Sequence, residues 1–214
     1  MCLAGTSGVW PRRQALRADL AIIADLVNPG ARVLDLGCGE GELLARLRAD
    51  KAVNGYGLEI DPGNITICIR KGVNVIEQDL NAGLGNFADD SFDMVVMTET
   101  LQSVKAPVQM LKEMLRIGRE CIVTFPNFGH WRCRTYLATR GRMPVSEHLP
   151  HSWYDTPNIH LCTFLDFERL CQAERFNIIE RFVVDAAHAN RPLINRFPNF
   201  FGTFAFYRLG RPGS

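Results

Sequence analysis

A short glycine-rich segment, VLDLGCGEGELL at residues 33–44, constrains this chain more than any other part of it. Four mainly apolar residues lead into glycines at every second position, and a helix-forming stretch follows at once. This order predicts a buried parallel strand that turns sharply into a helix. Glycines leave the main chain uncovered and a helix N-terminus offers free N–H groups, so the turn suits a ligand that presses against backbone.

The charge of the turn narrows the kind of ligand. Asp35 and Glu40 bracket the loop with negative charge. A loop that cradles phosphates usually carries Lys together with Ser or Thr at these places. The turn therefore suits a neutral or cationic ligand better than a polyphosphate.

Length and composition exclude several classes of protein. A chain of 214 residues suits a single domain, 1–214, with a substantial core. A formal net charge of +1 argues against a dedicated nucleic-acid surface, and no apolar run approaches the roughly 18 residues of a membrane span. The seven cysteines are scattered without a CxxC pair. We interpret them as reduced core thiols and expect a cytoplasmic protein that has neither a membrane segment nor a disulfide framework.

Strand and helix patterns alternate along residues 31–125, which we interpret as a cofactor-binding half. Strands are predicted at 33–36, 53–60, 74–77, 92–97 and 120–125, and helices at 12–27, 40–49, 62–71 and 106–117. Such alternation predicts an α/β fold with a mostly parallel sheet.

The alternation stops after Phe125. Residues 126–160 mix Pro, Gly, His, Trp and Arg, with a helix expected only near 130–140, and we interpret them as an insertion or lid. Residues 161–214 resume regular structure, with a helix near 164–173 and strands near 177–184 and 203–209.

Polar residues follow the later strands as the glycine turn follows the first. Ligands of open α/β sheets bind beyond the carboxyl ends of the strands, where Glu59 could accept hydrogen bonds from a ribose diol and Asp79 one from an adenine amino group. Each feature alone also fits a tight turn or a helix cap, so the prediction depends on their joint order. The predicted cofactor-binding residues are Asp35, Gly37, Cys38, Gly39, Gly41, Glu59, Ile60, Asp79, Leu80 and Thr98.

These residues carry a family resemblance. The segment DLGCGEG at 35–41 resembles motif I of class I S-adenosylmethionine-dependent methyltransferases, and the resemblance extends through Glu59, Asp79 and FDMVV at 92–96. It implies S-adenosylmethionine or S-adenosylhomocysteine as cofactor, a sulfonium compound without phosphate in the first case. It also implies a Rossmann-like seven-stranded, mostly parallel sheet whose last strand is antiparallel.

A narrower resemblance covers nearly the whole chain. The segments that carry it are TLQ at 100–102, EMLRIGR at 113–119, FPNFGHWR at 125–132, GRMP at 141–144 and WYDTPNIH at 153–160. They resemble the family of the methionine biosynthesis protein MetW. Members of that family are associated with homoserine O-acyltransferase, so the resemblance implies a role in that pathway, with the acyltransferase as a candidate partner.

The insertion offers weak candidates for chemistry. His151, Tyr154 and His160 are the candidate catalytic residues, since imidazole titrates near neutrality. For any one of the histidines, a structural hydrogen bond is the more common role. His148, His151 and His160 lack accompanying carboxylates or cysteines, so no metal is expected. Four arginines between 132 and 142 fit an anionic substrate, an acidic partner or a solvated helix face.

Two functions therefore stay open. The first is a cofactor-binding protein that supports a homoserine O-acyltransferase, and the second is a methyltransferase acting on an unidentified small molecule. The absence of an evident catalytic base does not exclude an enzyme, because methyl transfer to a nucleophilic acceptor can proceed by positioning alone.

Overall fold

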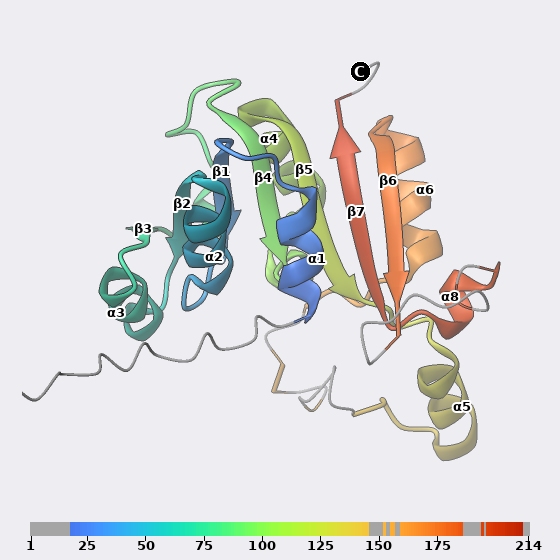
Figure 1. Ribbon diagram of the computed structural model, residues 1–214. Helices are drawn as coiled ribbons and strands as arrows, with labels where there is room; N and C mark the ends of the chain where they lie inside the picture. The colour runs from blue at the N-terminus through green and yellow to red at the C-terminus, as the bar shows by residue number, and fades with distance from the viewer. Residues whose placement is uncertain are drawn as a thin grey trace, which may run out of the picture.

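The computed structural model describes residues 18–145, 152, 155–156, 159–185, 194 and 196–211. Seven strands form one sheet in the order β3-β2-β1-β4-β5-β7-β6 (Figure 1). The strands are β1 (Arg32–Leu36), β2 (Asn54–Glu59), β3 (Asn74–Glu77), β4 (Phe92–Thr98), β5 (Gly118–Pro126), β6 (Asn177–Val184) and β7 (Phe204–Gly210). β1 to β5 pair in parallel, and β7 pairs antiparallel with both β5 and β6. The predicted α/β class, with an antiparallel last strand, is confirmed.

Helices cover both faces of this sheet. They are α1 (Ala18–Leu26), α2 (Glu42–Lys51), α3 (Pro62–Arg70), α4 (Pro107–Ile117), α5 (Trp131–Arg140), α6 (Phe164–Glu174) and α8 (Pro198–Phe201), with 3-10 turns η1 (Leu80–Ala82) and η2 (Leu101–Ser103). α1 and α2 lie on one face, whereas α4 and α6 lie on the other (Figure 1). α5 stands apart from the sheet.

The core follows the two-residue period of the strands. In β4, Met94 and Val96 pack on the side of α1 and α2, while Val95 and Met97 pack on the side of α4 and α6. The same alternation in β1 sends Leu34 and Leu36 to the α4 side. Asp35, between them, therefore points to the side that α1 and α2 cover.

The helix after the glycine turn begins later than the sequence pattern indicates. It was expected from residue 40, but α2 begins at Glu42. Gly39 and Gly41 both have a positive φ, +53° and +71°, and a left-handed residue cannot continue a right-handed helix. The turn is therefore two residues longer than predicted, which lengthens the stretch of exposed main chain.

The remaining boundaries agree with the predicted pattern to within about two residues. The short α8 was not predicted, and only the part of the helix expected at 12–27 that begins at Ala18 lies within the described residues. Among the described residues, no helix is both long and apolar enough to cross a membrane. The cysteines that the structure describes are all free thiols.

Candidate functional site

The turn between β1 and α2 is built from glycines that the backbone requires. Gly37 has a φ of +73°, and a Cβ there would lie 2.8 Å from the Thr100 hydroxyl. A Cβ on Gly41 would lie 2.9 Å from the Cys68 Sγ. A Cβ on Gly39 would meet nothing within 4 Å. Packing thus excludes side chains at the first and third glycines, while the middle one borders open space.

Glu59, at the carboxyl end of β2, holds this turn in place. Its Oε2 accepts a hydrogen bond of 2.8 Å from the Gly39 N–H. Its Oε1 accepts from the N–H groups of Ile60 and Asp61, at 2.8 and 2.9 Å. Glu59 is only 9% exposed as a residue, and three of the hydrogen bonds that its carboxylate accepts come from main chain. The side chain predicted to bind a ribose diol also fixes the loop that would contact the cofactor.

A pocket of about 410 Å³ opens beside the turn. Five of the predicted residues line it: Asp35, Gly37, Cys38, Gly39 and Thr98. Six further lining residues were missing from the predicted set: Leu20, Glu40, Glu42, Leu43, Asn64 and Glu99. Among the described residues that line it, four carry carboxylates and none is Lys or Arg. Such a pocket favours a cationic ligand and repels a polyphosphate.

Two buried polar atoms of the pocket lack a partner. Asp35 Oδ1 and Thr98 Oγ1 are both buried and accept or donate no hydrogen bond within the described part of the chain. Buried polar groups are nearly always satisfied, and an exception calls for an explanation. Both residues line the pocket, so a ligand with hydrogen-bond donors would supply what they lack.

The ionised form of Asp35 is also disfavoured by its surroundings. Burial, together with repulsion by the nearby Glu59 carboxylate, raises the pKa of Asp35 to about 7. A cationic ligand would favour the ionised carboxylate and lower this pKa. Burial raises the pKa of the neighbouring Cys38 thiol above its usual range, so Cys38 stays protonated and is a poor nucleophile.

The other predicted cofactor residues lie outside this pocket. Gly41 forms the N-terminal cap of α2. Ile60 is 58% exposed at the carboxyl end of β2. Asp79 Oδ1 accepts from the main-chain and side-chain nitrogens of Asn81, at 2.9 and 3.0 Å, and Leu80 packs against the core. The contacts of Asp79 and Leu80 with an adenine ring, and the roles of Gly41 and Ile60 in cofactor binding, stay predictions.

One rim of the pocket is connected to the insertion. Glu99 has a φ of +49°, which is strained for a residue other than glycine. Its carbonyl accepts from Gln102 Nε2 at 2.7 Å. The Gln102 carbonyl in turn accepts from the N–H groups of Ile159 and His160, both at 3.0 Å. His160 is thereby held near the pocket.

The other catalytic candidates cannot be placed. His151 and Tyr154 lie outside the described residues, as does His148. Within the described ranges, no group of three or more His, Cys, Asp or Glu side chains is arranged to hold a metal ion. Over the part of the chain that the structure describes, the site is therefore an acidic, glycine-lined pocket without an evident nucleophile.

Two comparisons concern the fold alone. An S-adenosylmethionine-dependent methyltransferase from Mesorhizobium loti is similar with a TM-score of 0.65 and 16% identity, over 91% of this chain and 98% of that chain. The [4+2]-cyclase SpnF is similar with a TM-score of 0.63 and 18% identity, over 92% of this chain and 81% of that chain. The chain therefore has the fold of class I methyltransferases.

Comparisons of sequence identify the family. The bifunctional methionine biosynthesis protein MetXA/MetW of Rhodopirellula baltica is 35% identical over 213 residues, which are 94% of this chain and 34% of that protein. The chain thus spans about a third of the length of this curated relative. The model of the family described as methionine biosynthesis protein MetW matches residues 17–209, and the chain belongs to that family.

Proposed function

We propose that this protein binds S-adenosylmethionine, or S-adenosylhomocysteine, in the pocket at the glycine turn and supports a homoserine O-acyltransferase in methionine biosynthesis. The observation that carries the cofactor proposal is the orphaned, buried Asp35 Oδ1 beside an open glycine turn. The lining residues that the structure describes include four carboxylates and neither Lys nor Arg. These features fit a ligand that carries an ammonium and a sulfonium group.

Each residue of the site would have a simple role in binding the cofactor. Asp35 and Thr98 would take hydrogen bonds from polar groups of the methionine part, and Gly39 would let the ligand approach the main chain. Glu59 would keep the turn in shape and offer its remaining lone pair to a ribose hydroxyl. Bound S-adenosylmethionine would supply a methyl group on a cationic sulfur.

Support for the partner comes from the R. baltica relative. Its name combines MetXA with MetW in one bifunctional chain, and the present chain spans 34% of it. Two functions joined in one chain often act on one another or in sequence.

A methyltransferase is the second candidate. The observation that favours it is the position of His160, whose main chain is tied through Gln102 to the strained Glu99 at the pocket rim. In this candidate function the imidazole of His160 would turn toward that rim and accept a proton from the methyl acceptor. The fold itself does not distinguish a methyltransferase from an accessory protein, because one fold hosts many chemistries.

A paired experiment separates the two candidates. Calorimetry measures S-adenosylmethionine binding to the purified chain, and acylation of homoserine by the purified acyltransferase is assayed with and without the chain. Faster acylation in the presence of the chain is the expected result. An unchanged acylation rate, together with S-adenosylhomocysteine formed from S-adenosylmethionine in the presence of pathway metabolites, would support the methyltransferase instead. If calorimetry detects no heat of binding, the proposal that the protein binds S-adenosylmethionine fails for both candidate functions.

Replacing Gly39 with Val tests the placement of the pocket. A valine at Gly39 would place its side chain in the open space beside the turn, and we expect S-adenosylmethionine affinity to fall by at least about tenfold. The backbone is left-handed there, so the variant also loses about 1–2 kcal/mol of stability.

Gly30→Val is the matched control. Gly30 has a φ of +71° and open space around its Cβ position, but it precedes the opposite end of β1. We expect a similar loss of stability with unchanged cofactor affinity. Equal affinities for wild type and Gly39→Val would show that the ligand binds elsewhere.

A further inference from the structure

Helix α5 stands apart from the sheet, and none of its side chains is fully buried. It begins just after the carboxyl end of β5 and extends beyond the body of the molecule (Figure 1). Trp131 is 37% exposed and Leu137 43%. More than a third of each of these large apolar residues therefore stays uncovered on this ten-residue helix. An exposed apolar surface of this kind is typical of a docking site.

The neighbouring α8 extends the same surface. Asn127, at the end of β5, is buried and donates from Nδ2 to the carbonyls of Asn199 and Gly202, at 3.2 and 2.8 Å. Arg134 of α5 lies over the ring of Phe200, 5.9 Å from its centroid. The two segments are therefore held side by side, and their exposed aromatic residues form one surface, which we call the α5–α8 surface.

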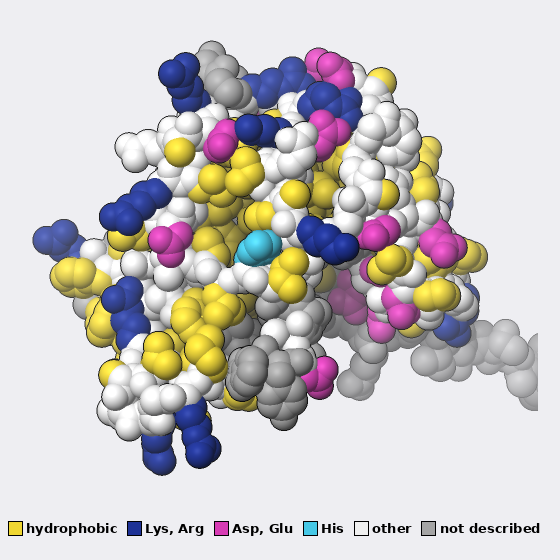
Figure 2. Space-filling model, turned by 180° about the vertical axis from the view of Figure 1, so that it is seen from behind, with side chains coloured by type: hydrophobic (Ala, Val, Ile, Leu, Met, Phe, Trp, Pro, Cys, Tyr) yellow, Lys and Arg dark blue, Asp and Glu magenta, His cyan; other side chains and the backbone are white. Residues whose placement is uncertain are grey.

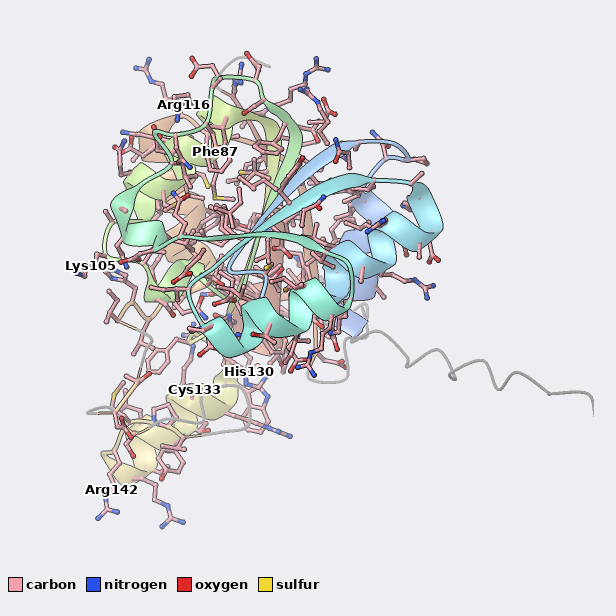
Figure 3. All side chains as sticks on the ribbon, turned by 90° about the vertical axis from the view of Figure 1, so that its left-hand side faces the viewer. Phe87, Lys105, Arg116, His130, Cys133 and Arg142 are labelled. Carbon is pink, nitrogen blue, oxygen red and sulfur yellow. The ribbon has the colours of Figure 1, made fainter. Side chains whose placement is uncertain are left out.

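Arginine is the second component of this surface. Arg132 lies over the Trp131 ring and Arg196 over the Phe197 ring, at 5.6 and 5.5 Å from the centroids. Arg132, Tyr136 and Arg140 are spaced four residues apart, so they share one stripe of the helix. Figure 3 shows Arg142 extending away from the body. Tyrosine, tryptophan and arginine are the residues enriched at energetically important positions of protein interfaces.

The charged side chains of this surface are all positive over residues 126–145. Residues 126–145 contain four arginines and neither Asp nor Glu, whereas the whole chain has a net charge of +1. The rest of the chain is therefore net negative. On the lobe that carries α5, Figure 2 shows hydrophobic and basic side chains together, with no acidic one in view. Within the described part of the chain, Arg132, Arg140 and Arg142 form no ion pair. They are available to a partner that carries carboxylates.

We propose that the α5–α8 surface docks an acidic protein surface with an apolar centre, and that its occupant is the acyltransferase. This proposal rests on the proposed function. Residues 126–145 contain no lysine, and arginine is the side chain that pairs carboxylates in a bidentate, oriented way. Ten residues with three exposed large apolar side chains also make a small anchor for a lipid surface. Both features favour a protein over a membrane.

The test uses the full chain and the purified homoserine O-acyltransferase of the same organism, with the dissociation constant measured at low and high salt. For the wild type we expect binding that weakens as salt is added. Arg132→Glu/Arg142→Glu should weaken binding at low salt by at least about tenfold. Neither residue is buried, so the fold should be retained.

Two further variants sharpen the result. Arg70→Glu/Arg169→Glu makes the same change of charge at exposed positions of α3 and α6, and its binding should stay within twofold of wild type. Trp131→Ala removes apolar area without altering charge and should weaken binding about tenfold. All variants should bind S-adenosylmethionine as the wild type does, which shows that they are folded.

The outcomes separate this proposal from the proposed function. If the wild type does not bind the acyltransferase, the accessory function fails. If the wild type binds but both α5 variants bind equally well, only the docking surface is overturned. Binding to phosphatidylglycerol vesicles that Arg132→Glu/Arg142→Glu abolishes would assign the surface to a membrane. A dimer by light scattering that the same variant dissociates would assign it to a second copy. Either result would overturn the acyltransferase as occupant.

Discussion

Replacing Asp35 with Asn is expected to make the free protein more stable at pH 8. Burial and the Glu59 carboxylate raise the pKa of Asp35 from 3.8 to about 7. Between those values the folded state keeps a proton that the unfolded chain has released, so the free energy of unfolding falls as the pH rises from about 4 to about 7. Above pH 7 the wild type carries the whole penalty, on the order of 4 kcal/mol, and the variant carries none.

Thermal unfolding at two pH values measures this effect. The melting temperature of Asp35→Asn should exceed that of wild type by about 8–16 °C at pH 8. At pH 5 the difference in unfolding free energy should shrink to about 1–2 kcal/mol. Asp93→Asn is the control with the opposite sign, because hydrogen bonds from Arg32 lower the pKa of Asp93. That variant should be less stable than wild type at pH 8.

Asp35→Asn should also weaken the binding of S-adenosylmethionine. Loss of a hydrogen bond between charged groups corresponds to about 2–3 kcal/mol, or roughly 30- to 150-fold in affinity. For the wild type, affinity for S-adenosylmethionine should rise as the pH increases through about 7, because only ionised Asp35 attracts a cation. Calorimetry across pH 5.5 to 8.5 checks both statements. A variant that gains stability yet binds normally would place the ligand away from Asp35.

Replacing Glu59 with Gln is expected to lower both stability and cofactor affinity, which is the second large effect. The amide oxygen can replace only one carboxylate oxygen, so its NH2 group faces either the Gly39 N–H or those of Ile60 and Asp61. A buried donor left unsatisfied costs about 1–3 kcal/mol, so the melting temperature should fall by about 2–12 °C. The loosened turn should bind S-adenosylmethionine at least about tenfold more weakly.

Glu77→Gln is the matched control for this change. Glu77 pairs with Glu59 in the β2–β3 register but is exposed, so its variant should unfold and bind like wild type. Glu59→Gln carries a further signature, since the Glu59 charge contributes to the raised pKa of Asp35. The midpoint of the pH dependence of binding should move to lower pH in this variant alone. An unchanged midpoint would show that the two carboxylates do not interact.

Much of the fold could be predicted because it follows from local patterns. The alternation of apolar runs and amphipathic stretches gives the strands and helices, and the segment at 35–41 places the site at the carboxyl end of β1. Asp35 and Thr98 were predicted for the same reason, since each comes at or near a strand end. Patterns of this kind are set by residues close together in sequence.

The features of the site that could not be predicted depend on contacts between residues that are distant in sequence. Leu20 reaches the pocket from α1 and Asn64 from α3, and nothing in either helix pattern indicates this. The positive φ of Glu99 is hidden by its residue type, because such a backbone is expected of Gly or Asn. The inward turn of the Glu59 carboxylate depends on where the N–H of Gly39 lies after folding.

The position of β7 has a consequence for how the chain is made. β7 comes last in sequence among the described strands, yet it lies between β5 and β6 and pairs with both. Until it has left the ribosome, β5 presents an unpaired apolar edge and β6 has no neighbour to join. Pairings this distant in sequence form slowly, and unpaired strand edges invite aggregation. Nascent chains that stop before residue 204 should therefore be the species most in need of a chaperone.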